Sequence, residues 1–226
     1  MTRHSPSALI FDVFGTCVDW RSAVAREVAA VLDVDGAAFA DAWRGEYQPA
    51  MEQIRSGARG YVRLDTLHAE NLARVAARFG VSAPPDLTSA WEKLDPWPDV
   101  IPGLERIRAR RIIAPCSNGS IALMTRLARY AGLPWDCILG AEIARAYKPA
   151  RLVYQAACEA LHLPPARVMM VAAHNDDLAA ARAAGLATAF VPRPREHGPD
   201  QTTDLEPSAE WDICAADFEA LAEALP

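Results

Sequence analysis

The chain has 226 residues, which is long enough for one sizeable α/β domain with a modest insertion. Its composition, with 51% hydrophobic and 23% charged residues, is ordinary for a globular protein. Its formal net charge of −6, without any run of lysine or arginine, argues against nucleic-acid binding. No apolar stretch approaches the roughly 18 residues that a membrane span needs, and the polar first residues do not suggest a secretory signal.

The first predicted strand is the short apolar run 8–11, which ends at Asp12 and is typical of a parallel strand buried on both faces. The pattern then changes, and apolar residues recur at helical spacing in three stretches: 22–32, 37–54 and 63–79. A turn is expected between the last two stretches. Residues 20–95 are therefore predicted to be mainly helical.

Strands and helices alternate in the second half of the chain. We expect strands at 112–116, 137–139, 168–172, 187–191 and 211–214. We expect helices at 121–131, 149–161, 178–184 and 218–225, and a loop rich in proline and charge at 193–209. This alternation predicts a doubly wound α/β fold with a parallel sheet.

Ligands of such sheets bind beyond the carboxyl ends of the strands, so the polar residues that close each strand are the candidates for a site. These residues are Asp12, Ser117, Asn118 and the run 174–177, and Lys148 joins them from the loop before a predicted helix.

At these positions the sequence resembles the haloacid dehalogenase (HAD) superfamily and, within it, the type II (S)-2-haloacid dehalogenases. Four segments carry the resemblance, in this order: Phe11-Asp12-Val13-Phe14-Gly15-Thr16, Ser117-Asn118-Gly119, Lys148-Pro149 and Ala172-Ala173-His174-Asn175-Asp176-Asp177-Leu178. The resemblance implies a HAD-like α/β core of residues 1–19 and 96–226, with residues 20–95 inserted as a helical cap. It also implies a small 2-haloacid substrate, a released halide ion, no cofactor and a homodimer.

The implied reaction is hydrolytic dehalogenation through an ester on Asp12. A carboxylate in a partly dry cleft, aimed at an electrophilic carbon, can displace a leaving group and form such an ester. In-line attack inverts C2, so an L-2-haloacid would give a D-2-hydroxy acid. The resemblance gives Thr16 and Lys148 the task of positioning Asp12, whose plain alternative is a carboxylate that caps a turn.

The substrate carboxylate is expected to contact Ser117, Asn118 and nearby backbone N–H groups, with Asn175 as a further substrate-binding residue. The second step, hydrolysis of the ester, needs a base near the ester carbonyl. The resemblance gives this role to Asp177. Tyr154 matches a polar position of the family near the substrate, although it could equally pack in the core.

Phe14 separates this chain from the phosphatases of the superfamily, which carry a second aspartate two positions after the nucleophile. An aromatic ring cannot protonate a leaving alkoxide, whereas a halide leaves without a proton. We therefore expect no metal ion, although Asp12, Asp176 and Asp177 could in principle supply oxygen ligands to Mg²⁺. A magnesium-dependent phosphatase acting on a small phosphorylated metabolite stays open as an alternative.

Arg44 is at the position where the dehalogenases carry an arginine that receives the halide. Its guanidinium offers several N–H donors and stays charged. The alternative is a solvent-exposed arginine paired with Glu46 or Glu52. Phe14, Trp43 and Tyr61 are expected to form an apolar wall around the halide and alkyl group, or else to pack the cap against the core.

His174 marks a departure from the family, because well-known dehalogenases have Ser-Ser-Asn where this chain has Ala172-Ala173-His174. Histidine titrates near working pH and can take over part of the base or donor role, or it can be structural. We expect such a pocket to prefer a smaller halide or substrate. The same change leaves open a catalytically idle protein that binds a small acid or a protein partner.

The five cysteines are odd in number and form no CxxC pair, which predicts reduced, mostly buried thiols in a cytoplasmic protein. Cys17 and Cys116 flank candidate catalytic residues, so each is either a reactive thiol or a small apolar packing residue.

Overall fold

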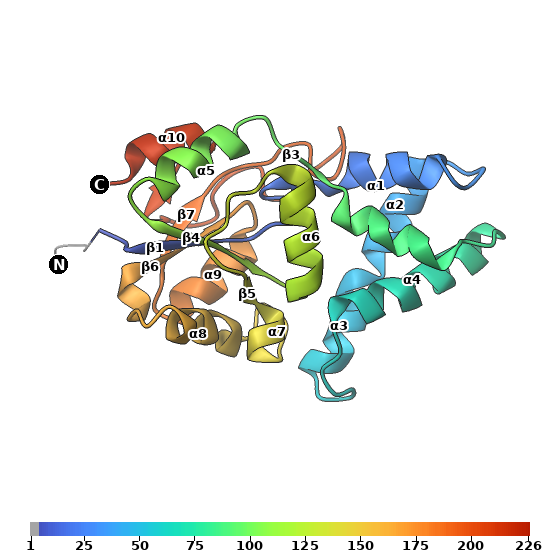
Figure 1. Ribbon diagram of the computed structural model, residues 1–226, viewed down its shortest axis with the longest axis horizontal. Helices are drawn as coiled ribbons and strands as arrows, with labels where there is room; N and C mark the ends of the chain where they lie inside the picture. The colour runs from blue at the N-terminus through green and yellow to red at the C-terminus, as the bar shows by residue number, and fades with distance from the viewer. Residues whose placement is uncertain (1–4) are drawn as a thin grey trace.

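The computed structural model describes residues 5–226 of the chain. A β-sheet with helices on both of its faces lies beside a separate group of helices (Figure 1). Within residues 5–226, none of the helices combines the length and the apolar character that crossing a bilayer requires.

The sheet has six parallel strands in the order β5-β4-β1-β6-β7-β8. Their bounds are β1 (Ala8–Phe11), β4 (Ile112–Ser117), β5 (Leu139–Gly140), β6 (Val168–Ala172), β7 (Ala187–Phe190) and β8 (Ile213–Cys214). The central strand β1 pairs with β4 and β6, so that Leu9 lies beside Ile113 and Met169. All four residues of β1 are buried, which explains its unbroken apolar run.

Helices cover both faces of the sheet, as Figure 1 shows. One face packs against α5 (Val100–Arg108), α6 (Ile121–Ala131) and α10 (Phe218–Ala224), and the other against α8 (Arg151–Ala160) and α9 (Asn175–Ala183). The short helices α7 (Ala141–Ala144) and η2 (Pro165–Arg167) lie in the connections. Phe11 contacts Phe218 of α10 at a ring-centroid distance of 5.5 Å, whereas Ile10 faces the opposite apolar cluster. The predicted doubly wound α/β fold is confirmed.

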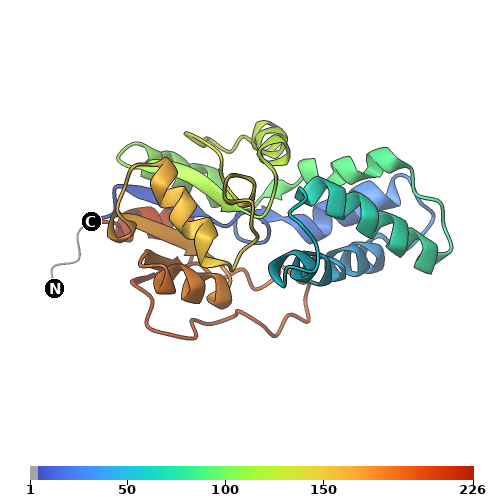
Figure 2. The same cartoon turned by 90° about the horizontal axis from the view of Figure 1, so that it is seen from below.

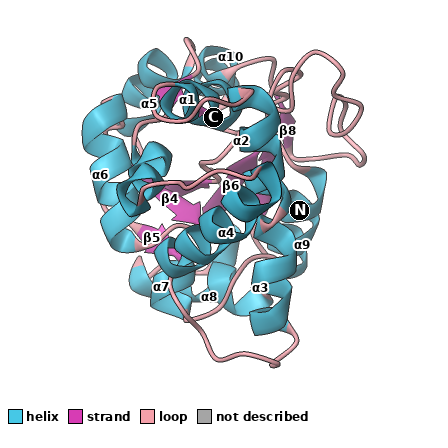
Figure 3. Ribbon diagram, turned by 90° about the vertical axis from the view of Figure 1, so that its right-hand side faces the viewer, coloured by secondary structure: helices cyan, strands magenta, loops and turns pink. Residues whose placement is uncertain are grey.

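The second group of helices, here called the helical insert, spans residues 20–92. It contains α1 (Trp20–Ala29), α2 (Gly36–Gly45), α3 (Tyr47–Arg55), α4 (Leu64–Phe79) and the 3₁₀ helix η1 (Pro85–Glu92). The two-residue strands β2 (Val18–Asp19) and β3 (Asp95–Pro96) pair antiparallel where the chain enters and leaves it. Figure 3 looks onto the insert, with α2, α3 and α4 in front of the sheet. The division into a core and a cap domain stays a prediction.

Several of the predicted helical stretches have other bounds in the structure. The stretch 37–54 is not one helix, because α2 ends at Gly45 and α3 begins at Tyr47. Pro49 explains the break: it lacks the N–H that would bond to the carbonyl of Gly45, and its ring would clash with that carbonyl in a continuous helix. The helix predicted from residue 149 begins only at Arg151.

Helix α9 begins at Asn175, three residues earlier than predicted, with Asp176 and Asp177 in its first turn. The positive end of the helix dipole favours carboxylates at this place. The early start places the Asp177 carboxylate at the carboxyl end of the sheet.

Helix α5 was not among the predicted helices, because it contains Pro102 and Gly103, and proline and glycine usually interrupt a helix. Pro102 is in the first turn of α5, where a missing N–H costs no hydrogen bond. A Cβ atom at Gly103 would lie 2.5 Å from the Cβ of Phe218. The glycine therefore permits the close approach of α5 and α10.

Candidate active site

A cavity of about 1280 Å³ opens between the carboxyl end of the sheet and the helical insert. Among the residues that line it are Asp12, Phe14, Arg44, Asn118, Lys148, His174 and Asp177. The cavity thus brings together side chains from the ends of β1, β4 and β6 with one from α2.

Asp12 follows β1 directly, and its backbone N–H continues the sheet by donating to Val171 O at 3.0 Å. Lys148 Nζ lies 2.8 Å from Oδ1 of Asp12, and Thr16 Oγ1 donates to Oδ2 at 2.7 Å. The Thr16 hydroxyl also accepts the N–H of Ala173 at 2.9 Å. Because the hydroxyl oxygen accepts this second bond, its proton is directed at Asp12. The structure therefore brings Asp12, Thr16 and Lys148 together, as predicted.

Asp12 is only 7% exposed. Burial alone would raise its pKa, but the neighbouring Lys148 and His174 hold the pKa well below its usual range. Burial likewise disfavours the charged form of Lys148, yet Asp12 and Asp177 raise the pKa of its ammonium. Asp12 is therefore an ionised carboxylate in a site with little water around it.

Asp177 shares the ammonium of Lys148, with Nζ 2.5 Å from Oδ2. Tyr154 donates its hydroxyl to the other carboxylate oxygen, Oδ1, at 2.5 Å. Burial and the Asp177 carboxylate raise the pKa of Tyr154, so its hydroxyl keeps its proton and stays a donor. Both oxygens of Asp177 are thus engaged, and Tyr154 lies behind Asp177 rather than on the cavity wall.

The other predicted substrate-binding residues at the sheet edge differ in their placement. Asn118 lines the cavity, and its Oδ1 accepts the N–H of Lys148 at 2.8 Å. Ser117 is fully buried and its Oγ accepts the N–H of Gly119 at 3.1 Å. Asn175 donates to Asp204 Oδ1 at 2.7 Å and does not line the cavity. Substrate contacts of these residues stay a prediction.

Arg44 reaches the cavity from α2 in the helical insert. Its Cζ lies 4.0 Å from the ring centroid of Tyr47 and 5.4 Å from that of Trp20. Its Nη1 is buried and has no hydrogen-bond partner within residues 5–226. Glu46 instead pairs with Arg74 and Arg78, and Glu52 pairs with Arg55. An unpaired, buried guanidinium nitrogen is what an anion-binding position requires.

Phe14 lines the cavity, with the rings of Trp91 and His68 edge-on to it at centroid distances of 5.8 Å and 6.5 Å. Burial and the nearby Arg44 lower the pKa of His68 to about 3, so this imidazole is neutral. Trp43 lies deeper and donates its indole N–H to His68 O at 3.1 Å. Of the predicted apolar wall, Phe14 therefore faces the cavity and Trp43 packs behind it. Tyr61 is not among the lining residues, and its ring centroid lies 5.5 Å from that of Tyr147.

His174 is held by two carboxylates, one of which the sequence analysis missed. Its Nδ1 lies 3.2 Å from Asp12 Oδ2, and its Nε2 lies 2.7 Å from Oε2 of Glu196. Glu196 belongs to the loop after β7, which Figure 2 shows running back towards the helical insert. Its second oxygen accepts the indole N–H of Trp20 at 3.0 Å, and the residue is 1% exposed.

A second missed residue, Arg193, anchors the start of this loop. It donates to Thr16 O at 2.9 Å and forms two bonds with the Asp99 carboxylate, at 2.7 Å and 2.8 Å. A useful signal was available, since the loop follows the carboxyl end of a predicted strand and is rich in charge. Arg193 and Glu196 thus tie this loop to the segment that carries Asp12.

Comparison with known proteins places this geometry in a family. A family model described as haloacid dehalogenase-like hydrolase matches residues 6–185. The chain belongs to the haloacid dehalogenase-like hydrolases. A curated relative is (S)-2-haloacid dehalogenase 4A of Burkholderia cepacia, which is 28% identical over 193 residues, covering 82% of this chain and 83% of the relative.

Solved structures of this hydrolase family are also similar to the chain. The defluorinating L-2-haloacid dehalogenase Rha0230 is 49% identical, with a TM-score of 0.95 and 98% of each chain covered. The L-2-haloacid dehalogenase PA0810 is 43% identical, with a TM-score of 0.94, and the match covers 96% of this chain and 97% of that protein.

The oxygen donors of this HAD-like hydrolase do not fit a divalent metal ion. Asp12, Asp176 and Asp177 line the cavity, but the ammonium of Lys148 bridges Asp12 and Asp177. A fixed cation therefore already balances the charge that would attract Mg²⁺, which prefers several free oxygen ligands.

The cysteines beside the site do not offer a thiolate. Burial and the Asp12 carboxylate raise the pKa of Cys17 well above its usual value. Burial raises the pKa of Cys116 to about 12. Both residues are fully buried, which favours the packing interpretation over reactive thiols.

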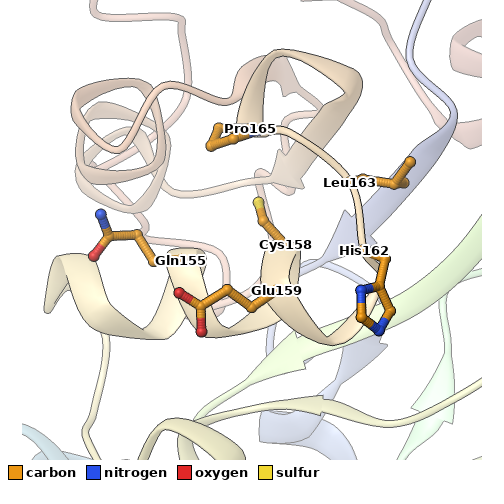
Figure 4. Close-up of a pocket in the computed structure, with 6 residues that line it drawn as sticks. All are labelled: Gln155, Cys158, Glu159, His162, Leu163 and Pro165. Atoms are coloured by element: carbon orange, nitrogen blue, oxygen red, sulfur yellow. The ribbon is translucent and has the colours of Figure 1, made fainter.

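A second hollow lies beside α8, and Figure 4 shows the residues around it: Gln155, Cys158, Glu159, His162, Leu163 and Pro165. None of the predicted site residues is among them. Burial raises the pKa of Cys158 to about 11, so its thiol is a weak nucleophile at neutral pH. The cavity at Asp12 is therefore the candidate active site of this hydrolase.

Proposed function

We propose that this hydrolase removes halide from short L-2-haloacids and forms D-2-hydroxy acids through an ester on Asp12. The observation that carries the proposal is a buried, ionised Asp12 on one side of the cavity and a buried, unpaired Arg44 nitrogen on the other. The (S)- and L-2-haloacid dehalogenases among its relatives support the substrate class.

In the first step, a carboxylate oxygen of Asp12 attacks C2 of the substrate in line with the carbon–halogen bond. The halide leaves with the bonding electrons and is received by the guanidinium of Arg44. Thr16 and Lys148 hold the carboxylate through the bonds described above, which reduces its freedom before attack. The ring of Phe14 contributes an apolar wall, and Asn118 with nearby N–H groups binds the substrate carboxylate.

In the second step, water attacks Cγ of the esterified Asp12 and releases the hydroxy acid. Lys148 stays beside the carbonyl and stabilises the negative charge that develops on oxygen. Asp177 Oδ2 contacts the ammonium of Lys148 at 2.5 Å and holds it in place. The Tyr154 hydroxyl donates to Asp177 Oδ1 at 2.5 Å and in turn fixes that carboxylate.

Halide release from chloroacetate, fluoroacetate and L-2-chloropropionate tests the proposal, with Asp12→Asn as the control. We expect release by the wild type only, and equal release by both proteins would remove Asp12 from the mechanism. Fluoroacetate is included because the relative that is 49% identical is a defluorinating enzyme. In a single turnover in ¹⁸O water, the label enters Asp12 and the first product carries ¹⁶O.

Two alternative functions predict different results in these assays. A magnesium-dependent phosphatase would lose turnover in EDTA, whereas we expect halide release to be unchanged by it. Phe14 disfavours the phosphatase function, because it stands where the phosphatases of the superfamily carry the aspartate that donates a proton. An idle protein that binds a small acid would release no halide from any of the three substrates.

We extend the proposal to the organisation of the protein. Residues 1–19 and 96–226 form the core domain, residues 20–95 form the cap domain, and two copies form a homodimer in the cytoplasm. Residues 1–4 of this division lie outside the described residues. The pairing of β2 with β3 at the borders of the insert supports the domain division. The five cysteines are free, which suits a reducing compartment. Light scattering after size-exclusion chromatography tests the dimer.

A further inference from the structure

His174 occupies an unusual position, because both of its ring nitrogens face carboxylates. Nδ1 lies 3.2 Å from Asp12 Oδ2 and Nε2 lies 2.7 Å from Glu196 Oε2. Glu196 cannot be a surface partner, since it is 1% exposed and its other oxygen accepts the indole N–H of Trp20 at 3.0 Å. The arrangement therefore fixes the ring and directs Nδ1 at the carboxylate that becomes esterified.

Asp177 is poorly placed to take a proton from the hydrolytic water. Its Oδ2 contacts Lys148 and its Oδ1 accepts the Tyr154 hydroxyl, so both oxygens already have a partner. Both residues line the cavity, but the side chain of His174 is 23% exposed whereas that of Asp177 is 10% exposed. A water molecule at the ester carbonyl can reach Nδ1 from the cavity.

We propose that His174 is the general base for hydrolysis of the Asp12 ester and that Glu196 is its positioning residue. The inference rests on the proposed function, because it concerns the second step of that reaction. A carboxylate that accepts one imidazole N–H fixes the tautomer whose other nitrogen can accept a proton, which is the logic of carboxylate–histidine pairs in hydrolases generally.

In the resting enzyme two carboxylates face the imidazole of His174, which favours its protonated form. Burial alone would lower the pKa of His174, but the carboxylates of Glu196 and Asp12 raise it well above its usual value. Esterification converts Asp12 into a neutral group and removes one of these two carboxylates. The Nδ1 proton then passes to water in the cavity, which leaves Nδ1 free to act as a base.

The proton balance closes over the cycle. Attack by Asp12 breaks the carbon–halogen bond and releases halide with its electron pair, and Nδ1 loses one proton to solvent. Nδ1 next removes a proton from the attacking water as its oxygen bonds to Cγ, and returns that proton to the hydroxy-acid oxygen as the ester bond breaks. The carboxylic acid proton left on Asp12 passes to Nδ1 and restores the starting pair. The sum is one haloacid and one water converted to one hydroxy acid, one halide and one proton.

Within residues 5–226, few charged groups face the pair of His174 and Glu196. Asp12 and Glu196 contact the imidazole, and Lys148 contacts Asp12 from the opposite side. Arg44 and His197 lower the pKa of Glu196 after the larger effect of His174, so Glu196 stays ionised although it is buried. Esterification changes the charge of Asp12 only, which makes His174 the group whose protonation responds.

The test is Glu196→Gln, because glutamine has one oxygen for the two donors that Glu196 satisfies, Trp20 and His174. We expect a normal burst of one halide per active site, a steady-state rate lower by about 10²-fold, and an accumulated Asp12 ester seen as a mass increase after acid quench. The acid limb of the pH profile for steady-state turnover should move to lower pH, because the carboxylate that raises the pKa of His174 is gone. Asp200→Asn, an exposed carboxylate of the same loop, is the matched control and should match the wild type.

His174→Ala is the second variant, and it keeps the proposal testable if Glu196→Gln does not fold. It should also give a halide burst and a trapped ester. Wild-type steady-state turnover with an unmoved acid limb in Glu196→Gln, or loss of the burst in a folded His174→Ala protein, would overturn the assignment. Failure of the proposed function is distinct, since the wild type itself would then release no halide.

Discussion

The ammonium of Lys148 lies 2.8 Å from Oδ1 of Asp12, and both side chains are buried. We expect Lys148→Met to lower the free energy of unfolding by about 3–5 kcal/mol, because it removes the cation that Asp12 and Asp177 share and leaves the buried Asp177 carboxylate without a charged partner. The value of kcat/KM for halide release should fall on the order of 10²-fold, since a donor beside the reacting group is lost. Urea denaturation and initial-rate measurements check the two effects.

Lys93→Met is the matched control, because Lys93 pairs with Glu27 at 3.0 Å while 45% of its side chain is exposed. Surface pairs of this kind contribute about 1 kcal/mol or less. A loss of stability in Lys148→Met as small as that of the control would contradict the prediction.

The pKa of Asp12 lies well below its ordinary value of 3.8, because Lys148 and His174 outweigh the effect of burial. The unfolded chain takes up this proton as the pH falls through about 4, whereas the folded protein does not. The ionised Asp12 therefore contributes its full stabilisation of the folded state above about pH 4, and this contribution is lost as the pH falls towards the lower pKa of the folded state. The difference in unfolding free energy between the wild type and Asp12→Asn should therefore shrink below about pH 4. A difference that stays constant down to pH 3, measured by urea denaturation, would count against this linkage.

Arg44→Lys should weaken halide binding while it keeps the positive charge. A lysine ammonium offers a point charge in place of the planar set of N–H donors. We expect kcat/KM to fall about 10²-fold and inhibition by added chloride to weaken. Arg78→Lys is the control, since Arg78 is 53% exposed and contacts Glu46 on the surface. Equal chloride inhibition in Arg44→Lys and in the control would place the halide elsewhere.

Gly103→Ala should destabilise the protein, because the new Cβ would lie 2.5 Å from Phe218 in α10. Overpacking of this kind costs about 1–3 kcal/mol. The control is Gly60→Ala, where an added Cβ meets nothing within 4 Å. Thermal unfolding should show a lower Tm for the first variant and a shift near zero for the second.

The order of strands and helices was predictable, since buried parallel strands leave an unbroken apolar run and their helices leave a periodic one. The prediction failed where tertiary contacts decide the outcome. Pro102 and Gly103 are consistent with a helix only once Phe218, more than a hundred residues later, is packed against it. Local pattern carries no information about that contact.

The candidate site was also predicted only in part. Asp12, Lys148 and Asp177 were predicted from their places at strand ends and from the family resemblance, and the structure brings them together. Glu196 was missed because nothing in a loop sequence shows that one of its carboxylates is buried. Its role depends on Trp20 and His174, which lie far from it in the chain.

The short strands β2 and β3 connect the helical insert to the rest of the chain and pair with each other. Val18 pairs with Pro96 and Asp19 with Asp95, so both crossings of the chain lie next to each other. A rotation about these adjacent crossings would carry Arg44 away from Asp12 without breaking the packing inside either part. The insert is nevertheless fastened on its other side, where the Trp20 indole N–H donates to Glu196 at 3.0 Å and the Tyr147 hydroxyl donates to Val62 O at 2.9 Å, so the separation of Arg44 from Asp12 depends on these contacts.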